Sequence, residues 1–158
     1  MATKNFIGLE SAASEKVINS LNDLLANHQI YYTNLRGLHW DIKGDKFFEL
    51  HELYEEYYNS EAETIDAVAE RIAMLGGHPE NRFSEYLKKT DINELSNVSD
   101  WESGLKHIMD SMKTFLDKYR KLFASAKEAC DIGTAGLASK QISSIEANLW
   151  KLTAYVEN

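Results

Sequence analysis

The residues with the clearest chemical potential lie on one predicted helix, over residues 46–75. His51 and Glu55 form a first pair and Asp66 and Glu70 a second, each pair spaced four residues apart. At 100° per residue, Glu55 and Asp66 differ by only about 20° around the helix axis, so both pairs share one side of the helix. Histidine with carboxylates is the ligand set expected of non-haem iron, with manganese or zinc as alternatives.

Distance sets a sharper condition on these two pairs. His51 and Asp66 are 15 residues apart, which is roughly 22 Å along a helix that rises 1.5 Å per residue. They cannot bind one metal ion within a single helix. A two-fold antiparallel pairing of this helix with its symmetry mate, centred near Asn59, would bring the first pair of one subunit to the second pair of the other. The spacing therefore predicts two equivalent sites per dimer.

Composition and length indicate one globular domain over residues 1–158, with a short N-terminal tail of about ten residues. The chain has 158 residues, of which 44% are hydrophobic and 27% charged, with one proline and eight glycines, and so few breakers favour long helices. The single cysteine, Cys130, excludes an intrachain disulfide and fits a reducing compartment. No signal peptide is expected, because the N-terminal residues lack a charged-then-apolar pattern. No apolar run reaches the roughly 20 residues that span a bilayer. A cytoplasmic location is expected.

Apolar residues at spacings of three and four predict four long helices, over residues 11–38, 46–75, 101–130 and 134–156. The run Gly76–Pro79 ends the second helix, and Asp131–Gly133 separates the last two. Short first and last connections make antiparallel neighbours, whereas the connection over 76–100 is long enough to cross the bundle, with a short extra helix at 83–88 or 92–95. The pattern predicts an all-α, ferritin-like four-helix bundle with one long crossover.

The usual ferritin ligands are missing from this predicted bundle. Ferritin-like di-iron sites within one subunit are built from Glu-x-x-His motifs. No histidine here has a glutamate three positions before it. The residues in that position are Leu25, Arg36, Phe48, Leu75 and Gly104.

Three segments carry a resemblance to one known family. The segment 34–44, Asn-Leu-Arg-Gly-Leu-His-Trp-Asp-Ile-Lys-Gly, resembles the Asn-Leu-His-Trp-Asn-x-x-Gly segment of Dps proteins, the mini-ferritins. The segment 47–52 resembles their second-histidine segment, and 65–77 is similar to their Asp-x-x-Ala-Glu-Arg segment. The spacings of twelve, fifteen and four residues between the histidines and acids also agree. The resemblance covers nearly the whole chain, including Leu149–Leu152 near its end.

The resemblance implies a hollow shell of twelve subunits that oxidises Fe²⁺, preferably with hydrogen peroxide, and stores the ferric mineral as a protection against oxidative stress. It implies a ferroxidase site at the two-fold interface, where a di-iron centre is expected. His39 and His51 would come from one subunit. Asp66 and Glu70 would come from the other, in agreement with the spacing argument above.

Two neighbouring residues also take roles from the resemblance. Glu55 stands where the family commonly has aspartate, and the extra methylene leaves open whether it contacts the metal directly or through water. Trp40 resembles the family's proximal tryptophan, an electron donor or a quencher of radicals. Both are counted with the site, Glu55 as a metal ligand and Trp40 beside the catalytic ligands.

Other polar residues are assigned from their position alone. Glu52 and Glu56 are expected to face the cavity as nucleation sites, and Glu128 and Asp131 are candidates for acidic pores at a three-fold axis. Glu61 is expected on a solvated face of the helix. The remaining histidines lack partners at metal spacing and are expected to be structural or surface residues: His28, His78 and His107.

Charge separates the competing functions. The net charge is −8, from 25 acids against 17 bases, and the N-terminal residues carry one lysine. Twelve such chains would sum to −96, which should repel DNA. DNA binding is therefore not expected, although a DNA-compacting nucleoid protein with incidental metal binding stays as an alternative. A passive metal-storage bundle without a redox role is a third possibility.

Overall fold

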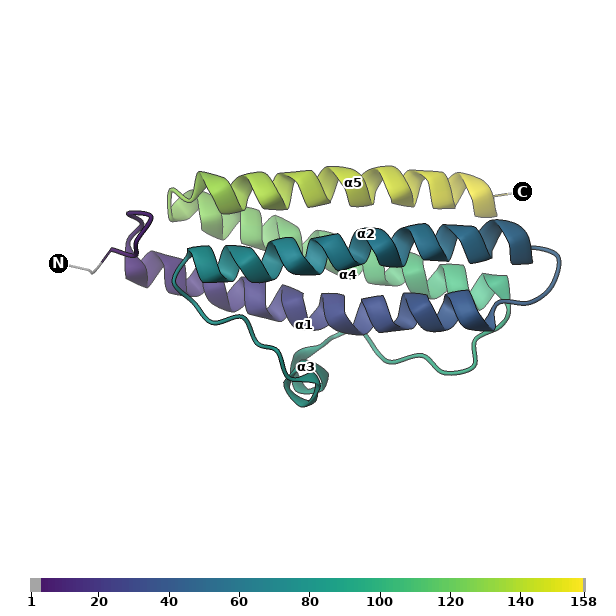
Figure 1. The fold of residues 1–158 in the computed structure, drawn as a ribbon. Coiled ribbons are helices and arrows are strands. Elements are labelled where there is room, and N and C mark those ends of the chain that lie inside the picture. Colours follow the sequence, from purple (N-terminus) through teal and green to yellow (C-terminus); the bar gives the residue numbers. More distant parts are fainter. Residues whose placement is uncertain (1–3, 158) are drawn as a thin grey trace.

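The computed structural model describes residues 4–157, which form five helices and no β-strand. They are α1 (Ser11–Asp41), α2 (Phe47–Met74), α3 (Phe83–Lys89), α4 (Trp101–Glu128) and α5 (Ile132–Val156). The four long helices lie side by side as a bundle, with α1 packed along α2 and against α4, and α4 packed along α5 (Figure 1). This confirms the predicted all-α, ferritin-like four-helix bundle.

The crossover runs from the end of α2 to the start of α4 along the outside of the bundle, where α3 packs against α1 (Figure 1). The predicted helix at 83–88 is confirmed by α3, whereas residues 92–95 are not helical. Their backbone is held by the side chain of Asn34 instead. Its amide nitrogen donates to the carbonyl of Asn93 at 2.8 Å, and its oxygen accepts from the backbone N–H of Leu95 at 2.9 Å.

Capping residues and backbone conformation determine where α4 and α5 begin and where α4 ends. Asp100 caps α4, since its side chain accepts from the backbone N–H of Ser103 at 2.9 Å. Asp131 accepts in the same way from Thr134 at 2.9 Å, so α5 begins at Ile132, two residues before the predicted start. α4 ends two residues early because Cys130 adopts a positive φ of 56°.

The core extends along the whole bundle and consists of large apolar and aromatic side chains. Its largest fully buried members are Tyr54, Tyr119, Phe115, Leu21, Leu24, Leu25, Leu35, Leu50, Ile72, Leu105, Ile108 and Leu122. Gly104 lies where α4 approaches α2 closely, because a Cβ built there would be 2.8 Å from the hydroxyl of Tyr54. Among the described helices, none has a stretch long and apolar enough to span a membrane.

Candidate metal site

The bundle brings His39 and His51 together at the turn between α1 and α2. His39 lies in the last turn of α1, and His51 lies in the second turn of α2. The turn between the helices is short, and Gly44 adopts a φ of +98° that favours glycine. The two imidazole rings stack with their centroids 3.7 Å apart and their planes 18° from parallel.

Hydrogen bonds fix the same tautomer in both rings. Nδ1 of His39 lies 2.7 Å from the backbone carbonyl of His51, and Nδ1 of His51 lies 2.9 Å from the carbonyl of His39. Because a carbonyl oxygen only accepts, each Nδ1 carries the hydrogen. In a neutral imidazole the Nε2 atom then keeps its lone pair, which is the form that binds metals.

Aromatic side chains hold the two rings in place. Phe47 stacks on His51 with centroids 4.9 Å apart, and Tyr58 meets His39 edge-on at 5.3 Å. Stacked and edge-on contacts of this kind favour one ring orientation over others. His39 is 8% exposed, so the protein surrounds most of its ring. The histidine pair is therefore preorganised.

The three carboxylates do not join the histidines within one chain. Glu55, Asp66 and Glu70 are exposed along α2. Within residues 4–157, no group of three or more histidine, cysteine or acidic side chains is placed to hold a metal ion. The structure thus brings together two of the five predicted ligands. The contribution of a second subunit stays a prediction.

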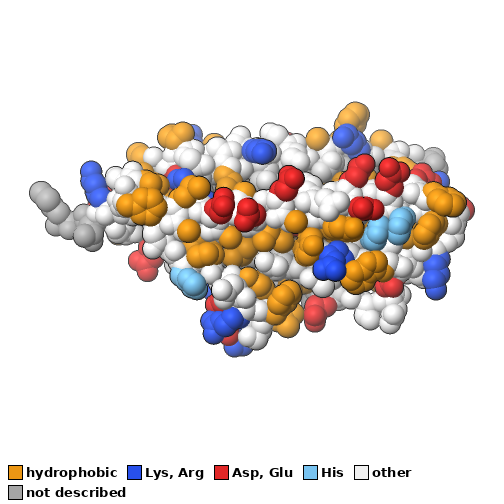
Figure 2. Space-filling model, in the orientation of Figure 1, with side chains coloured by type: hydrophobic (Ala, Val, Ile, Leu, Met, Phe, Trp, Pro, Cys, Tyr) orange, Lys and Arg blue, Asp and Glu red, His pale blue; other side chains and the backbone are white. Residues whose placement is uncertain are grey.

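Two large apolar side chains close in sequence to the histidine pair are open to solvent in the single chain. Trp40 is 66% exposed and Phe48 is 86% exposed. The guanidinium of Arg36 lies over the Trp40 ring, 4.9 Å from its centroid. Figure 2 shows histidine side chains at the α1–α2 turn, with hydrophobic and acidic side chains around them. Contiguous exposed apolar patches often mark interaction surfaces in soluble proteins.

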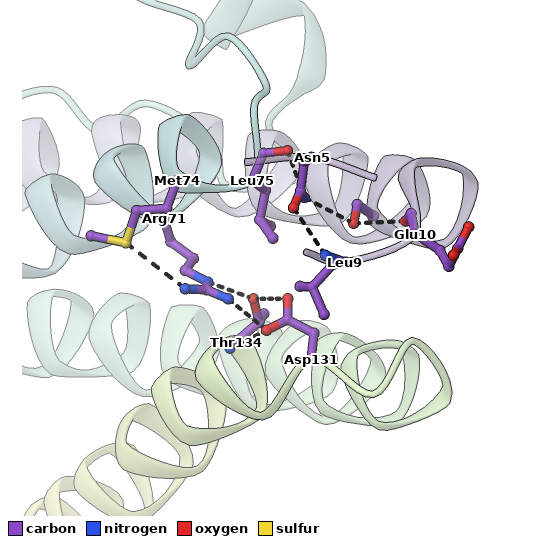
Figure 3. A network of polar contacts seen from close by, with 9 residues as sticks. Asn5, Leu9, Glu10, Arg71, Met74, Leu75, Asp131 and Thr134 are labelled. Atoms are coloured by element: carbon purple, nitrogen blue, oxygen red, sulfur yellow. Dashed lines mark hydrogen bonds and ion pairs between the residues drawn. The ribbon is translucent and has the colours of Figure 1, made fainter. Parts of the chain in front are cut away.

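The prediction that Asp131 lines an acidic pore is wrong. Its side chain is 2% exposed, and its Oδ1 accepts from Nη2 of Arg71 at 2.6 Å (Figure 3). Nε of the same guanidinium donates to the hydroxyl of Thr134 at 2.9 Å. Asp131 therefore ties the end of α2 to the start of α5. Glu128 is exposed and pairs with Lys16 at 3.2 Å.

The prediction that Glu61 faces solvent is also wrong. Glu61 is buried and forms a hydrogen bond with Nδ1 of His28. Nε2 of His28 lies 2.7 Å from the hydroxyl of Tyr119. The available signal was that His28 falls within the apolar stripe of the first helix, where a polar side chain needs a buried partner. Of the two roles expected for His28, structural or surface, the structure shows the structural one.

Comparisons with known proteins agree with this fold over nearly the whole chain. The family model described as a ferritin-like domain matches residues 18–158. The DNA protection during starvation protein of Porphyromonas gingivalis is 45% identical over 148 residues, covering 94% of this chain and 93% of that protein. The general stress protein 20U of Bacillus subtilis is 32% identical over 143 residues, covering 90% and 99%.

A solved structure is similar at the level of the complete fold. The Vibrio cholerae Dps protein, described as a member of a superfamily of ferritin-like diiron-carboxylate proteins, superposes with a TM-score of 0.97 at 41% identity. The match covers 99% of this chain and 98% of that chain. With the family model and the relatives above, it shows that this chain belongs to the Dps family of ferritin-like proteins, the mini-ferritins.

Proposed function

We propose that the protein oxidises Fe²⁺ at a site shared by two subunits, formed by His39 and His51 of one and Asp66 and Glu70 of the other. The carrying observation is the reciprocal hydrogen bonding of the two histidines, which leaves both Nε2 lone pairs free. Imidazole nitrogens with carboxylate oxygens suit ferrous iron.

The surroundings of the histidine pair support a partner subunit there. Trp40 and Phe48 are mostly exposed in the single chain, and a second copy of α2 would cover them. The second copy would also supply the carboxylates that one chain cannot bring to its own histidines. The Vibrio cholerae relative is described as a diiron-carboxylate protein, which agrees with a site that holds iron with acids.

The chemistry consumes ferrous iron in pairs. Two Fe²⁺ ions give up one electron each, and hydrogen peroxide takes both electrons and two protons to form two water molecules. Because both oxidising equivalents are used, no hydroxyl radical is released. Glu55 extends the acidic shell of the site, and Trp40 beside it would quench a stray radical. The ferric product would then be stored inside the shell, in the cytoplasm.

Iron oxidation depends on assembly under this proposal, because the site exists only where two subunits meet. A shell of twelve chains of 18.0 kDa would have a mass of roughly 216 kDa. Light scattering on the native protein, with and without iron, measures this mass. A stable monomer that oxidises iron at the full rate would contradict the shared site.

Subunit complementation tests the shared site directly. One variant carries His39→Ala and His51→Ala, and the other carries Asp66→Ala and Glu70→Ala. Each homo-oligomer should lack fast ferrous oxidation. In a mixed dimer, however, one of the two sites combines intact histidines with intact acids. Random mixing should restore about a quarter of the wild-type rate, since half of the interfaces are mixed and each has one intact site.

The outcomes of this experiment are distinct. Recovery in the mixed assembly, measured by stopped-flow absorbance after Fe²⁺ and peroxide are added, supports a site across the interface. Two inactive variants that stay inactive when mixed would overturn it, provided that native mass spectrometry shows mixed shells. A wild-type pair of differently tagged subunits, dissociated and reassembled in the same way, controls for losses during mixing.

The relatives named for DNA protection raise a second candidate, direct binding to DNA. The net charge of −8 per chain opposes it. We propose that any protection of DNA comes from the removal of ferrous iron and peroxide. A gel-shift titration at low salt should show no complex with duplex DNA, and a salt-sensitive shift would favour the DNA-binding alternative.

A further inference from the structure

A buried chain of hydrogen bonds crosses the centre of the bundle, apart from the proposed iron site. Glu61 of α2 contacts Nδ1 of His28 of α1, and Nε2 of His28 lies 2.7 Å from the hydroxyl of Tyr119 of α4. All three side chains are buried, and Phe115 stacks on the His28 ring with centroids 4.1 Å apart. None of the three has a part in the proposed iron chemistry.

The available hydrogen-bond partners decide where the protons lie among Glu61, His28 and Tyr119. The Tyr119 hydroxyl is fully buried, and within residues 4–157 its hydrogen-bond partner is Nε2 of His28. A protonated His28 would occupy that nitrogen and leave the phenol hydrogen without an acceptor, which is costly in a core. With a neutral imidazole, Tyr119 donates to Nε2 and Nδ1–H donates to the Glu61 carboxylate. The Tyr119 O–H and the His28 Nδ1–H then each have a hydrogen-bond acceptor.

We propose that Tyr119 is a redox-active tyrosine, oxidised by one-electron radical oxidants with His28 as the acceptor of its proton. The electron passes to the oxidant, which is reduced by one electron. The phenol O–H bond breaks, and a new N–H bond forms at Nε2 of His28. The products are a neutral phenoxyl radical and an imidazolium, and the imidazolium is paired with the Glu61 carboxylate.

The surroundings favour this coupled step over loss of the electron alone. Burial, and then the charge of Glu61, raise the pKa of the Tyr119 phenol well above its usual value, so a phenolate is not the starting species. A tyrosine that lost only its electron would leave a positive charge in an apolar interior. The step through His28 places that charge next to a carboxylate, where it is compensated.

Tyr31 provides a matched contrast in the same core. It is buried on α1 and its ring meets the same Phe115 edge-on at 5.3 Å. Its hydroxyl has no hydrogen-bond partner in the described chain. Tyr31 therefore has no base hydrogen-bonded to its hydroxyl that could take the proton on oxidation. Its burial resembles that of Tyr119.

The proposed radical site goes beyond iron oxidation and does not depend on it. Hydroxyl radical is one oxidant of the required class, and azide radical is a laboratory equivalent. A core tyrosine that accepts the oxidising equivalent and holds it would keep damage away from other side chains.

The test uses the complete iron-free protein and azide radicals made by pulse radiolysis. Electron paramagnetic resonance on samples frozen at increasing delays measures the phenoxyl signal. We expect a persistent signal in the wild type, a severalfold smaller one in Tyr119→Phe and an unchanged one in Tyr31→Phe. His28→Gln keeps a hydrogen-bonding side chain without a basic nitrogen and should lose the persistent signal too.

Two results would overturn the proposal. One is a persistent signal in Tyr119→Phe that equals the wild type, and the other is an equal loss in Tyr31→Phe. If Tyr119→Phe does not assemble, the hydrogen bond to the phenoxyl oxygen can be measured in the wild type instead. After exchange into D₂O, electron–nuclear double resonance should show one deuteron hydrogen-bonded to the phenoxyl oxygen, and a radical without it contradicts the role of His28. Because no iron is present, these results do not bear on the ferroxidase site.

Discussion

The ring of His51 donates to the backbone carbonyl of His39, and the ring of His39 donates to the carbonyl of His51. The carbonyl of His39 lies in the last turn of α1, where the ordinary helical partner is missing. Its hydrogen bond from His51 therefore completes the end of a helix as well as orienting a metal ligand. The two functions share the same atoms, so the ligand geometry is set by the fold itself.

Replacing both histidines, His39→Ala with His51→Ala, should abolish fast ferrous oxidation and leave the shell assembled. Each lost hydrogen bond costs only about 1 kcal/mol, which a packed bundle tolerates. Stopped-flow absorbance measures the oxidation, and light scattering measures the assembly. His78→Ala removes an exposed histidine away from the pair and should oxidise iron normally. An intact oxidation rate in the double variant would refute the ligand assignment.

Two helical glycines should respond in opposite directions to alanine. A Cβ at Gly104 would meet the buried hydroxyl of Tyr54 at 2.8 Å, so Gly104→Ala should destabilise the protein by about 1–3 kcal/mol. Gly136 has nothing within 4 Å of the same position, and Gly136→Ala should stabilise α5 by roughly 0.5–1 kcal/mol. Urea denaturation at one fixed subunit concentration measures both. Equal effects in the two variants would contradict the close approach of α4 to α2.

Removing the buried carboxylate, Asp131→Ala, should destabilise the protein by about 3–5 kcal/mol. The change leaves the Arg71 guanidinium without its partner and removes the N-cap of α5. Asp110→Ala is the matched control, because Asp110 is an exposed acid whose pair with Lys106 should contribute less than about 1 kcal/mol. Thermal unfolding followed by circular dichroism compares the two. A loss no larger than that of the control would show that Asp131 is not structural.

Acidification should lower the free energy of unfolding through protonation of His107, which contacts Asn34 beside the crossover. Burial lowers the pKa of His107 in the folded protein, so the unfolded chain binds the proton more readily. At high pH the titration of His107 therefore adds nothing to the free energy of unfolding. As the pH falls through the unfolded pKa of about 6.5, the titration of His107 lowers the free energy of unfolding. Protonation also removes the acceptor that the Asn34 amide uses at 3.1 Å.

The expected loss at His107 is about 0.5–1.5 kcal/mol, the value of one neutral hydrogen bond. Urea denaturation at about pH 7.5 and about pH 5.5 should show it in the wild type. His107→Gln should lose less stability between the two values, because glutamine does not titrate. An identical pH dependence in both proteins would assign the loss to other groups.

The helices were predictable because their apolar residues recur with the helical period. α2 was expected over residues 46–75 and spans Phe47–Met74. The ends were less predictable, since they depend on which side chain reaches a free backbone group. Asp131 shows this, because the run Asp-Ile-Gly reads as a break, yet a single capping aspartate lets α5 begin at once.

The candidate site was predictable to the extent that its ligands share one helix. The periodicity of α2 places His51, Glu55, Asp66 and Glu70 on one side, but periodicity alone does not give the partner of a residue on another helix. His39 therefore entered through the family resemblance. Glu61 was misread for the same reason, since its burial depends on His28, which lies 33 residues away along the chain.

Helix α2 also sets a limit on how this protein can change in evolution. Under the proposed assignment, the same helix carries half of one site near its start and half of another near its end. One inserted residue between Glu55 and Asp66 would rotate the acids by about 100° and shift them by about 1.5 Å. The crossover between α2 and α4 can lengthen, because each added loop residue costs little free energy. The length of α2 between the two ligand pairs is therefore constrained. Substitutions along α2 should be tolerated more readily than insertions or deletions.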